Sequence, residues 1–296
     1  MATIAEEHVA TVPDRRQAPY QEWDVGRLVR LIALLIGAVI FIFPFYYMVI
    51  VAFKTHPEIG LTAAIPTGLS LQNYATINGA INLGRTLVNS GIFTGGVLLL
   101  TLVFGLLAGY ALAQLHWRGR NVVFYTMLLF LIVPFQLLMI PLYVLIARDF
   151  GLADNYLGMI LPFAINSTAV FIFRQFFLQL PRELFEAARL DGASELQSLI
   201  LIVIPITRPA ILTALLVTFI GPWNEFLWPF LITKQLGLEP LAVALANFMS
   251  NIMSHEPNPP GALLAGAVVL VLPVVILFLI FQRQFVESSI GSSIKG

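Results

Sequence analysis

The stretch LLLTLVFGLLAGYALAQL, residues 98–115, decides the fold class. Drawn as a helix it is apolar on every side, whereas a strand of a membrane barrel would alternate apolar and polar residues. It lies inside a run without Asp, Glu, Lys or Arg that extends from residue 86 to residue 117. About 20 mostly apolar residues suffice for a helix to cross the hydrocarbon core of a bilayer. The stretch therefore predicts a transmembrane helix.

The composition of the whole chain has the same character. Hydrophobic residues make up 58% of the 296 residues and charged residues 11%, and the mean hydropathy is +0.88. Soluble globular chains carry about 25% charged residues, so this chain cannot cover a soluble surface. The absence of cysteine excludes a disulfide scaffold. The 16 basic and 16 acidic residues cancel, which argues against a nucleic-acid partner. A polytopic membrane protein, in contact with lipid, remains.

Five further charge-poor runs are long enough to cross a bilayer. Their bounds are 31–53, 121–147, 155–173, 209–233 and 257–282. The predicted fold class is therefore all-α, with six transmembrane helices, because open strands would leave backbone groups unpaired in lipid. Several runs contain proline, which marks either an ordinary packing kink or a hinge along a pathway.

The basic residues outside these runs predict the orientation. With six spans both termini lie on the same side, and that side collects 12 Lys and Arg residues against 4 on the other. Cytoplasmic loops carry the excess of Lys and Arg, so both termini are expected in the cytoplasm. The chain then divides into four predicted parts. These are a tail (1–27), the first helix with an external segment (28–84), a core of five helices (85–283) and a second tail (284–296).

The sequence lacks the motifs of catalysis. None of the three lysines follows a glycine, as a Walker A phosphate-binding loop requires, and the four histidines are widely separated. No HExxH or GxSxG pattern is present. We expect a protein that moves its substrate rather than changing it, with no catalytic residue, metal site or cofactor of its own.

The dense internal group of charges lies between the fourth and fifth runs, in PRELFEAARLDGASELQ, residues 181–197. At 100° per residue it predicts an amphipathic helix of about three turns. Its charged face comprises Arg182, Glu183, Glu186 and Arg189. Its apolar face comprises Leu184, Phe185, Ala187 and Ala188, with Asp191 at its end.

The ends of this helix are also marked. Pro181 suits a first helical position, and Gly192 suits the residue just past a helix end. Ser194 and Gln197 have the spacing of a capping box, which predicts a second helix that runs toward Pro205.

A helix this short is not stable alone in water, so its apolar face must pack against something. One interpretation places it at the lipid interface. The other makes it a docking site for a cytoplasmic partner. The small apolar face favours docking, because two alanines allow another surface to approach closely but insert little into lipid.

This part of the chain contains Glu186-Ala187-Ala188, followed by Gly192 and then by Ile202-x-Ile204-Pro205. The pattern resembles the EAA loop of ABC importer permeases. Ile204 stands where that family has leucine. FFLQLPRELFEAARLDGAS (176–194), FIGPWNEFLWPFLI (219–232) and FQRQFVESSIGSSIKG (281–296) resemble the carbohydrate-uptake class. Residues 28–296 as a whole resemble the six-span permease of the maltose-transporter type.

The resemblance implies a type I ABC importer permease in a bacterial or archaeal cell membrane, and a division of labour. Two permease chains, the second a paralogue, form the pathway. Two cytoplasmic ATPase subunits bind ATP and Mg²⁺, and an external solute-binding protein delivers the substrate. The loop 181–205 docks on the ATPase, with Leu184 and Phe185 as apolar anchors. The implied docking residues are Leu184, Phe185, Glu186, Ala187, Ala188, Asp191 and Gly192. Whether the tail 284–296 enters the ATPase interface stays open.

Glu225 is the one acid inside a predicted span, and an intramembrane carboxylate indicates a functional site. With Trp223 and Asn224 it forms a candidate substrate pathway, since aromatic, amide and carboxylate groups suit the ring and hydroxyls of a sugar. The alternative is a hydrated carboxylate near the outer interface, where tryptophans form an aromatic belt.

The function predicted from these features is a permease subunit that forms half of the pathway for a sugar or oligosaccharide. Glycerol phosphate and a polyamine are the alternative substrates. A phosphate would favour basic residues at mid-depth, and the spans carry none. A self-sufficient secondary carrier would need a coupling-ion site and usually internal repeats, and the two halves show no repeat. The sequence does not identify the sugar.

Overall fold

The computed structural model describes residues 25–57, 61–65, 68–252 and 256–291. Over these ranges the chain is helical, and a single bridge pairs Lys54 with Leu69 where no strand forms. The all-α class predicted from the sequence is confirmed. The three longest helices are α1 (Val25–Ala52), α3 (Leu83–Ala113) and α14 (Pro259–Gly291).

The remaining helices are shorter. They are α2 (Gln72–Ile81), α4 (Arg120–Phe130), α5 (Phe135–Tyr143), α6 (Tyr156–Ile160), α7 (Ser167–Phe177), α8 (Arg182–Leu190), α9 (Glu195–Ser198), α10 (Ile204–Ile206), α11 (Arg208–Asn224), α12 (Leu227–Ile232) and α13 (Leu241–Asn247). Short 3₁₀ or π turns connect or extend them. They are η1 (Leu61–Ala64), η2 (Val144–Asp149), η3 (Leu161–Phe163), η4 (Leu199–Val203), η5 (Leu236–Leu238) and η6 (Phe248–Ile252).

Three helices are long and apolar enough to cross a membrane on their own: α1, α3 and residues 259–282 of α14. Three helix pairs reach the same length together but are bent at a break. The pairs are 120–130 with 135–149, bent by 97°; 156–163 with 167–177, bent by 48°; and 195–206 with 208–224, bent by 83°. If each bent pair is one span, the described residues hold six, the number that the charge-poor runs predict.

Proline explains two of the interruptions. The ring of a proline clashes with the carbonyl four residues earlier and ends a helix there. The ring of Pro134 clashes with a helical carbonyl at Phe130, where α4 ends. The ring of Pro229 does the same at Glu225, just beyond the end of α11. The fifth charge-poor run is therefore not one continuous helix, because α11 ends at Asn224 and α12 starts at Leu227.

Contacts divide the chain into two parts after Tyr46, and each is described by itself. In the first part, residues 25–46 of α1 expose nearly all of their apolar side chains. Residues 1–24 of the predicted N-terminal tail lie outside the described residues. In the predicted C-terminal tail, α14 stays helical to Gly291, and residues 292–296 lie outside the described residues.

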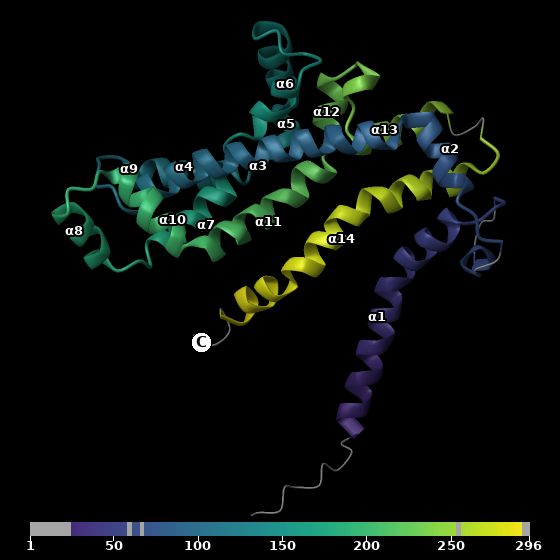
Figure 1. Cartoon of the computed structure of the whole chain (residues 1–296), viewed down its shortest axis with the longest axis horizontal. Coiled ribbons are helices and arrows are strands. Elements are labelled where there is room, and N and C mark those ends of the chain that lie inside the picture. The colour runs from purple at the N-terminus through teal and green to yellow at the C-terminus, as the bar shows by residue number, and fades with distance from the viewer. Residues whose placement is uncertain (1–24, 58–60, 66–67, 253–255, 292–296) are drawn as a thin grey trace, which may run out of the picture. The chain divides into compact units, whose positions relative to one another are not determined.

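In the second part α3 is the central helix, in contact with α2, α7, α11 and α13 (Figure 1). The α8 end of α3 is packed by a cluster that includes Tyr110, Phe173 and Phe177. The α2 and α13 end is packed by another cluster around Ile77 and Phe248. No proline interrupts α3, so the two ends are joined by one continuous helix of 31 residues.

Glycine allows α3 and α7 to approach closely. A Cβ added at Gly109 would lie 2.7 Å from the Cβ of Phe173 and 3.3 Å from the backbone nitrogen of Arg174. Because the contacting atoms belong to the backbone and to the first side-chain carbon, they cannot move aside cheaply. The small residue at this position therefore sets the distance between the two helices.

Candidate functional site

The turn after α8 is closed by backbone hydrogen bonds. Gly192 has φ +79°, a left-handed conformation that costs a residue with a Cβ about 1–2 kcal/mol. The Gly192 amide donates to the Arg189 carbonyl at 3.1 Å, and the Ala193 amide donates to the Ala188 carbonyl at 2.9 Å. This pair of bonds is the Schellman motif. The predicted helix end at Gly192 is confirmed, whereas Pro181 precedes the first helical residue by one position.

The next helix starts at once with the predicted capping box. The Gln197 amide donates to the Ser194 hydroxyl, and the Gln197 side chain accepts from the Ser194 amide at 2.8 Å. A helix end and a helix start therefore follow each other with their backbone groups paired. This arrangement fixes the angle between α8 and α9.

The apolar face of α8 packs against the rest of the chain. Phe185 is 6% exposed and Ala188 is also buried, and both Phe185 and Leu184 pack in the cluster around Tyr110. This corrects the role expected for Phe185 as an anchor on a partner, because its ring already lies 6.3 Å from the ring of Tyr110.

The opposite face of α8 is open to solvent. It comprises Glu183, Glu186, Ala187 and Leu190, at positions i, i+3, i+4 and i+7 of the helix. Leu190 is 90% exposed. Asp191 and Gly192 are exposed as well. Of the seven predicted docking residues, Glu186, Ala187, Asp191 and Gly192 are accessible to a partner. We call Glu183, Glu186, Ala187 and Leu190 the outward face.

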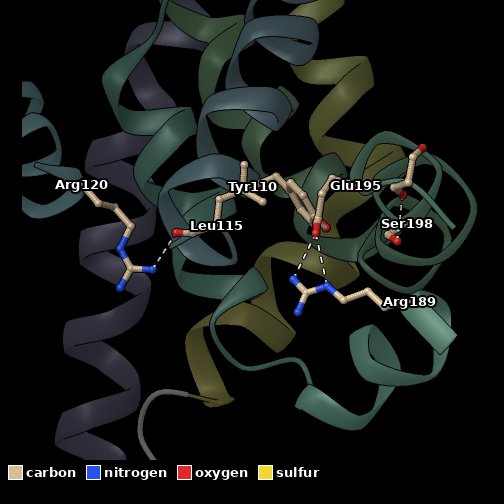
Figure 2. A network of polar contacts seen from close by, with 7 residues as sticks. Tyr110, Leu115, Arg120, Arg189, Glu195 and Ser198 are labelled. Carbon is tan, nitrogen blue, oxygen red and sulfur yellow. Dashed lines mark hydrogen bonds and ion pairs between the residues drawn. The ribbon is translucent and has the colours of Figure 1, made fainter. Parts of the chain in front are cut away.

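One carboxylate joins the loop to α3, as Figure 2 shows. Glu195, the first residue of α9, accepts from the Tyr110 hydroxyl on its Oε2 at 2.7 Å. Its Oε1 accepts from the guanidinium of Arg189, in the last turn of α8, at 3.0 and 3.3 Å. Each oxygen of this carboxylate thus binds a different helix. A charged hydrogen-bond partner makes such bonds stronger than neutral ones.

A cavity of about 610 Å³ lies where three helices are interrupted. Its walls include residues from the break between α4 and α5, the break between η3 and α7, and the residue that follows α11. Irregular backbone at membrane depth is tolerated where it is buried in protein or lines a water-filled cavity. The coincidence of the three breaks therefore marks this cavity as a candidate pathway.

The lining of the cavity is apolar with a few polar groups. Phenylalanines from three elements contribute, and the polar side chains are Asn166, Ser167, Thr168, Thr218 and Glu225. Asn166 accepts from the Ala169 amide at 3.0 Å, and Glu225 accepts from the Trp228 amide at 3.2 Å. Asn166 thus caps α7, and Glu225, which precedes the N-cap residue of α12, binds an amide in the first turn of that helix. Glu225 is the one charged residue among the described residues that line it.

The structure separates the three residues predicted for the pathway. Glu225 lines the cavity, whereas Trp223 and Asn224 do not. The Trp223 ring is buried, stacks on Phe219, and donates from its indole nitrogen to the Leu270 carbonyl of α14 at 2.9 Å. Trp223 thus fastens α11 to α14. The Asn224 amide donates to the Ile220 carbonyl within its own helix.

A buried carboxyl lies at the other end of α3. Glu239 is 5% exposed and accepts from the Asn247 side chain at 2.8 Å. Its backbone carbonyl accepts from the side chain of Asn89 on α3. Burial raises the pKa of the Glu239 carboxyl, and the Asn247 hydrogen bond opposes this effect.

Several residues of both sites were not predicted from the sequence. A signal for the cavity is Asn166-Ser167-Thr168, a helix-start pattern inside an apolar run. Leu190 could have been assigned to the same helix face as Ala187, because it is an apolar residue three positions later. No signal linked Tyr110 to Glu195, because the two residues are far apart in the sequence.

Comparisons with known proteins agree with this geometry. The family model described as "Binding-protein-dependent transport system inner membrane component" matches residues 101–288. The arabinooligosaccharides transport system permease protein AraQ of Bacillus subtilis (strain 168) is 32% identical, over 93% of this chain and 98% of its own. The sn-glycerol-3-phosphate transport system permease protein UgpE of Yersinia pestis bv. Antiqua (strain Antiqua) is 30% identical, over 88% of this chain and 95% of its own.

A solved structure shares the fold. It is a chain in the crystal structure of a bacterial ABC transporter involved in the import of the acidic polysaccharide alginate. The TM-score is 0.78 at 24% sequence identity, and the match covers 88% of this chain and 96% of that chain.

Proposed function

The chain belongs to the family of binding-protein-dependent transport system inner membrane components, and from this premise we propose that it forms half of the translocation pathway for a neutral sugar or oligosaccharide. It is a multi-pass membrane protein with the permease fold of an ABC importer. The resemblance of the sequence to ABC importer permeases is therefore confirmed for the family and the fold. The substrate, the partners, the orientation and the roles of individual residues are part of the proposal.

The observation that carries the substrate class is the lining of the cavity between the helix breaks. Phenylalanine rings offer faces to a sugar, and hydroxyl, amide and carboxylate groups offer hydrogen bonds to its hydroxyls. The described residues that line it include no Lys, Arg or His. A phosphorylated solute would meet the Glu225 carboxylate with no positive charge to compensate for it. The cavity therefore favours a neutral sugar over glycerol phosphate, although a relative is named for the latter.

The outward face of α8 supports the proposed docking on an ATPase. Ala187 and Leu190 provide an exposed apolar centre, and Glu183 and Glu186 flank it with negative charge. We expect the partner to offer an apolar pocket with basic residues at its edge. ATP and Mg²⁺ would bind on that partner. Under this proposal the loop 181–205 and both termini lie in the cytoplasm, as the distribution of Lys and Arg predicts.

The remaining partners follow from the same proposal. A second permease chain, a paralogue, would complete the cavity from its open side. An external solute-binding protein would deliver the sugar at the end of α3 opposite the loop.

Purification from native membranes tests this proposal. An affinity-tagged chain should bring down an ATPase subunit and a second permease. Leu190→Asp should abolish co-purification of the ATPase, because a charge would enter the apolar centre of the docking surface. Leu236→Asp is the matched control, since Leu236 is also exposed but belongs to η5, at the other end of α3. If no ATPase co-purifies with the unmodified chain, the proposed function is wrong.

The substrate class requires a transport measurement. The purified complex, reconstituted in liposomes with its binding protein, should take up a neutral oligosaccharide in an ATP-dependent manner. Glycerol phosphate and a polyamine, each at the same concentration, should not be taken up. Selective uptake of either one would overturn the assignment of a sugar without affecting the permease role.

A further inference from the structure

The hydrogen-bond network at Glu195 links the docking loop to the central helix, and we propose that Glu195 is the positioning residue that makes α3 follow the loop during each ATP cycle. This inference rests on the proposed function, because it assumes that an ATPase moves the loop. Tyr110 and Arg189 are the partners through which Glu195 acts.

The carboxylate connects the loop to α3, a helix that is distant in the sequence, and also braces the turn between α8 and α9. Its Oε2 accepts from Tyr110 on α3 at 2.7 Å, and its Oε1 accepts from Arg189 on α8 at 3.0 Å. Tyr110 and Glu195 lie 85 residues apart in the sequence. A displacement of α8 or α9 therefore reaches α3 through two short charge-assisted bonds. Figure 2 shows both partners converging on the carboxylate.

The surroundings fix the position of the Tyr110 ring, whereas Glu195 is half-buried and Arg189 is exposed. Tyr110 is 4% exposed, and its ring lies 6.4 Å from that of Phe177 and 6.3 Å from that of Phe185. The turn between α8 and α9 is closed by the Schellman motif and by the capping box. The turn thus fixes α8 relative to α9, and among the described residues the hydroxyl of Tyr110 donates the hydrogen bond that ties the loop to α3.

The far end of α3 is tied to the opposite side of the molecule. The Asn89 side chain donates to the backbone carbonyls of Gly237 and Glu239, each at 3.0 Å, and accepts from the Tyr156 hydroxyl at 2.7 Å. The Ser90 hydroxyl accepts from the Leu241 amide at 2.8 Å. With 1.5 Å of rise per residue, Asn89 and Tyr110 are about 30 Å apart along one proline-free helix. A shift of α3 at Glu195 therefore moves the segment 237–241.

Two variants separate this role from folding. Tyr110→Phe removes one hydrogen bond and keeps the ring contacts, and Glu195→Gln removes the charge and keeps the shape. Ser198→Ala is the matched control, because the buried Ser198 hydroxyl donates to the Ser194 carbonyl within the same segment and links no other element. The readout is the number of ATP molecules hydrolysed per solute imported by the reconstituted complex.

We expect Tyr110→Phe and Glu195→Gln each to raise this ratio roughly tenfold, the size of an ordinary coupling between sites. The double variant should be no worse than either single one, since both break the same link. Ser198→Ala should leave the ratio unchanged. Each variant should still co-purify with the ATPase, because the outward face of α8 is intact.

Two results would overturn the inference. The first is a normal ratio in both variants, which would show that α3 moves without this link. The second is a failure of both variants to assemble, which would make the network a purely structural one. Either result leaves the proposed function standing if the unmodified complex imports the sugar with ATP. Absence of ATP-dependent import by the unmodified complex would instead contradict the proposed function itself.

Discussion

The loop 181–205 and the cavity both lie at breaks between helices, but their side-chain hydrogen bonds span different distances along the sequence. At the loop, Glu195 accepts from Arg189 and also from Tyr110, 85 residues away in the sequence, so the loop is tied to a distant element. At the cavity, the side chains of Asn166 and Glu225 each accept from a backbone amide only three residues further along the chain. A region tied to its neighbours transmits displacement, and a region with local caps can rearrange around a solute.

The largest expected effect comes from removing the Phe185 ring, which packs the loop against α3. Phe185→Ala deletes a buried ring that contacts Tyr110, and such truncations cost about 3–5 kcal/mol. We expect α8 to detach, so that limited proteolysis cuts the loop in the variant and not in the unmodified protein. Leu196→Ala, at an exposed position of the same loop, should resist cleavage. Equal resistance of both variants would mean that the loop does not depend on Tyr110 and its neighbours.

The close approach of α3 to α7 should tolerate no added methyl group. Gly109→Ala places a Cβ against Phe173 and the backbone of Arg174, and overpacking of this kind costs about 1–3 kcal/mol. The thermal midpoint of the purified protein should fall. Gly91→Ala on the same helix meets no atom within 4 Å, so its midpoint should stay the same or rise. A rise for both variants would place α7 farther from α3 than the structure does.

The turn of the loop should show a smaller and purely conformational cost. Gly192→Ala meets no atom within 4 Å but must adopt φ +79°, which costs about 1–2 kcal/mol. Gly192→Asn should lose less, because asparagine enters the left-handed region more readily. Thermal unfolding of the two variants measures the difference. The reverse order would show that space, rather than backbone conformation, selects glycine here.

The smallest effect concerns Glu239, at the end of α3 opposite the loop. Burial raises the pKa of this carboxyl in the folded protein, so the folded state keeps the proton to a higher pH than the unfolded state. Stability should fall as the pH rises from the ordinary carboxyl pKa through the raised one. Glu239→Gln should remove this part of the pH dependence and add about 1 kcal/mol above it. Thermal midpoints between pH 4 and pH 8 measure the slope.

A second variant tests whether Glu239 is the group that causes this pH dependence. Asn247→Ala removes the side-chain hydrogen bond that lowers the pKa of Glu239. The decline of the midpoint with pH should therefore become steeper in this variant. If Asn247→Ala and Glu239→Gln shift the slope in the same direction, Glu239 is not the titrating group.

Features that depend on neighbours in the sequence were predictable. The helix end at Gly192 and the capping box of Ser194 and Gln197 follow from local backbone chemistry, and the structure contains both. The charge-poor runs located the apolar segments because the bilayer sets a minimum length. Prolines in the runs predicted kinks or hinges, and two of the three bends lie within such runs, but a count of apolar residues did not give their size. The third bend, at residue 207, lies before the run 209–233.

Features that depend on contacts between distant residues were not predictable. Phe185 was assigned to a partner because a single helix face does not reveal whether its own chain or another covers it. The cavity combines residues from three breaks, and the order of these breaks along the chain does not show that they converge. Glu225 was found because a charge in an apolar run is conspicuous. Thr218 carries no charge, and Asn166 was marked only by a helix-start pattern.

The central claim is that the outward face of α8 docks on an ATPase while its inward face holds the loop to this chain. The sequence contains no cysteine, so single cysteines can be introduced without background. In the purified complex, Leu190→Cys should form a cross-link to a cysteine placed in the apolar pocket of the ATPase subunit. Ala188→Cys, on the buried face of the same helix, should not. A cross-link from Ala188→Cys without one from Leu190→Cys would contradict the account.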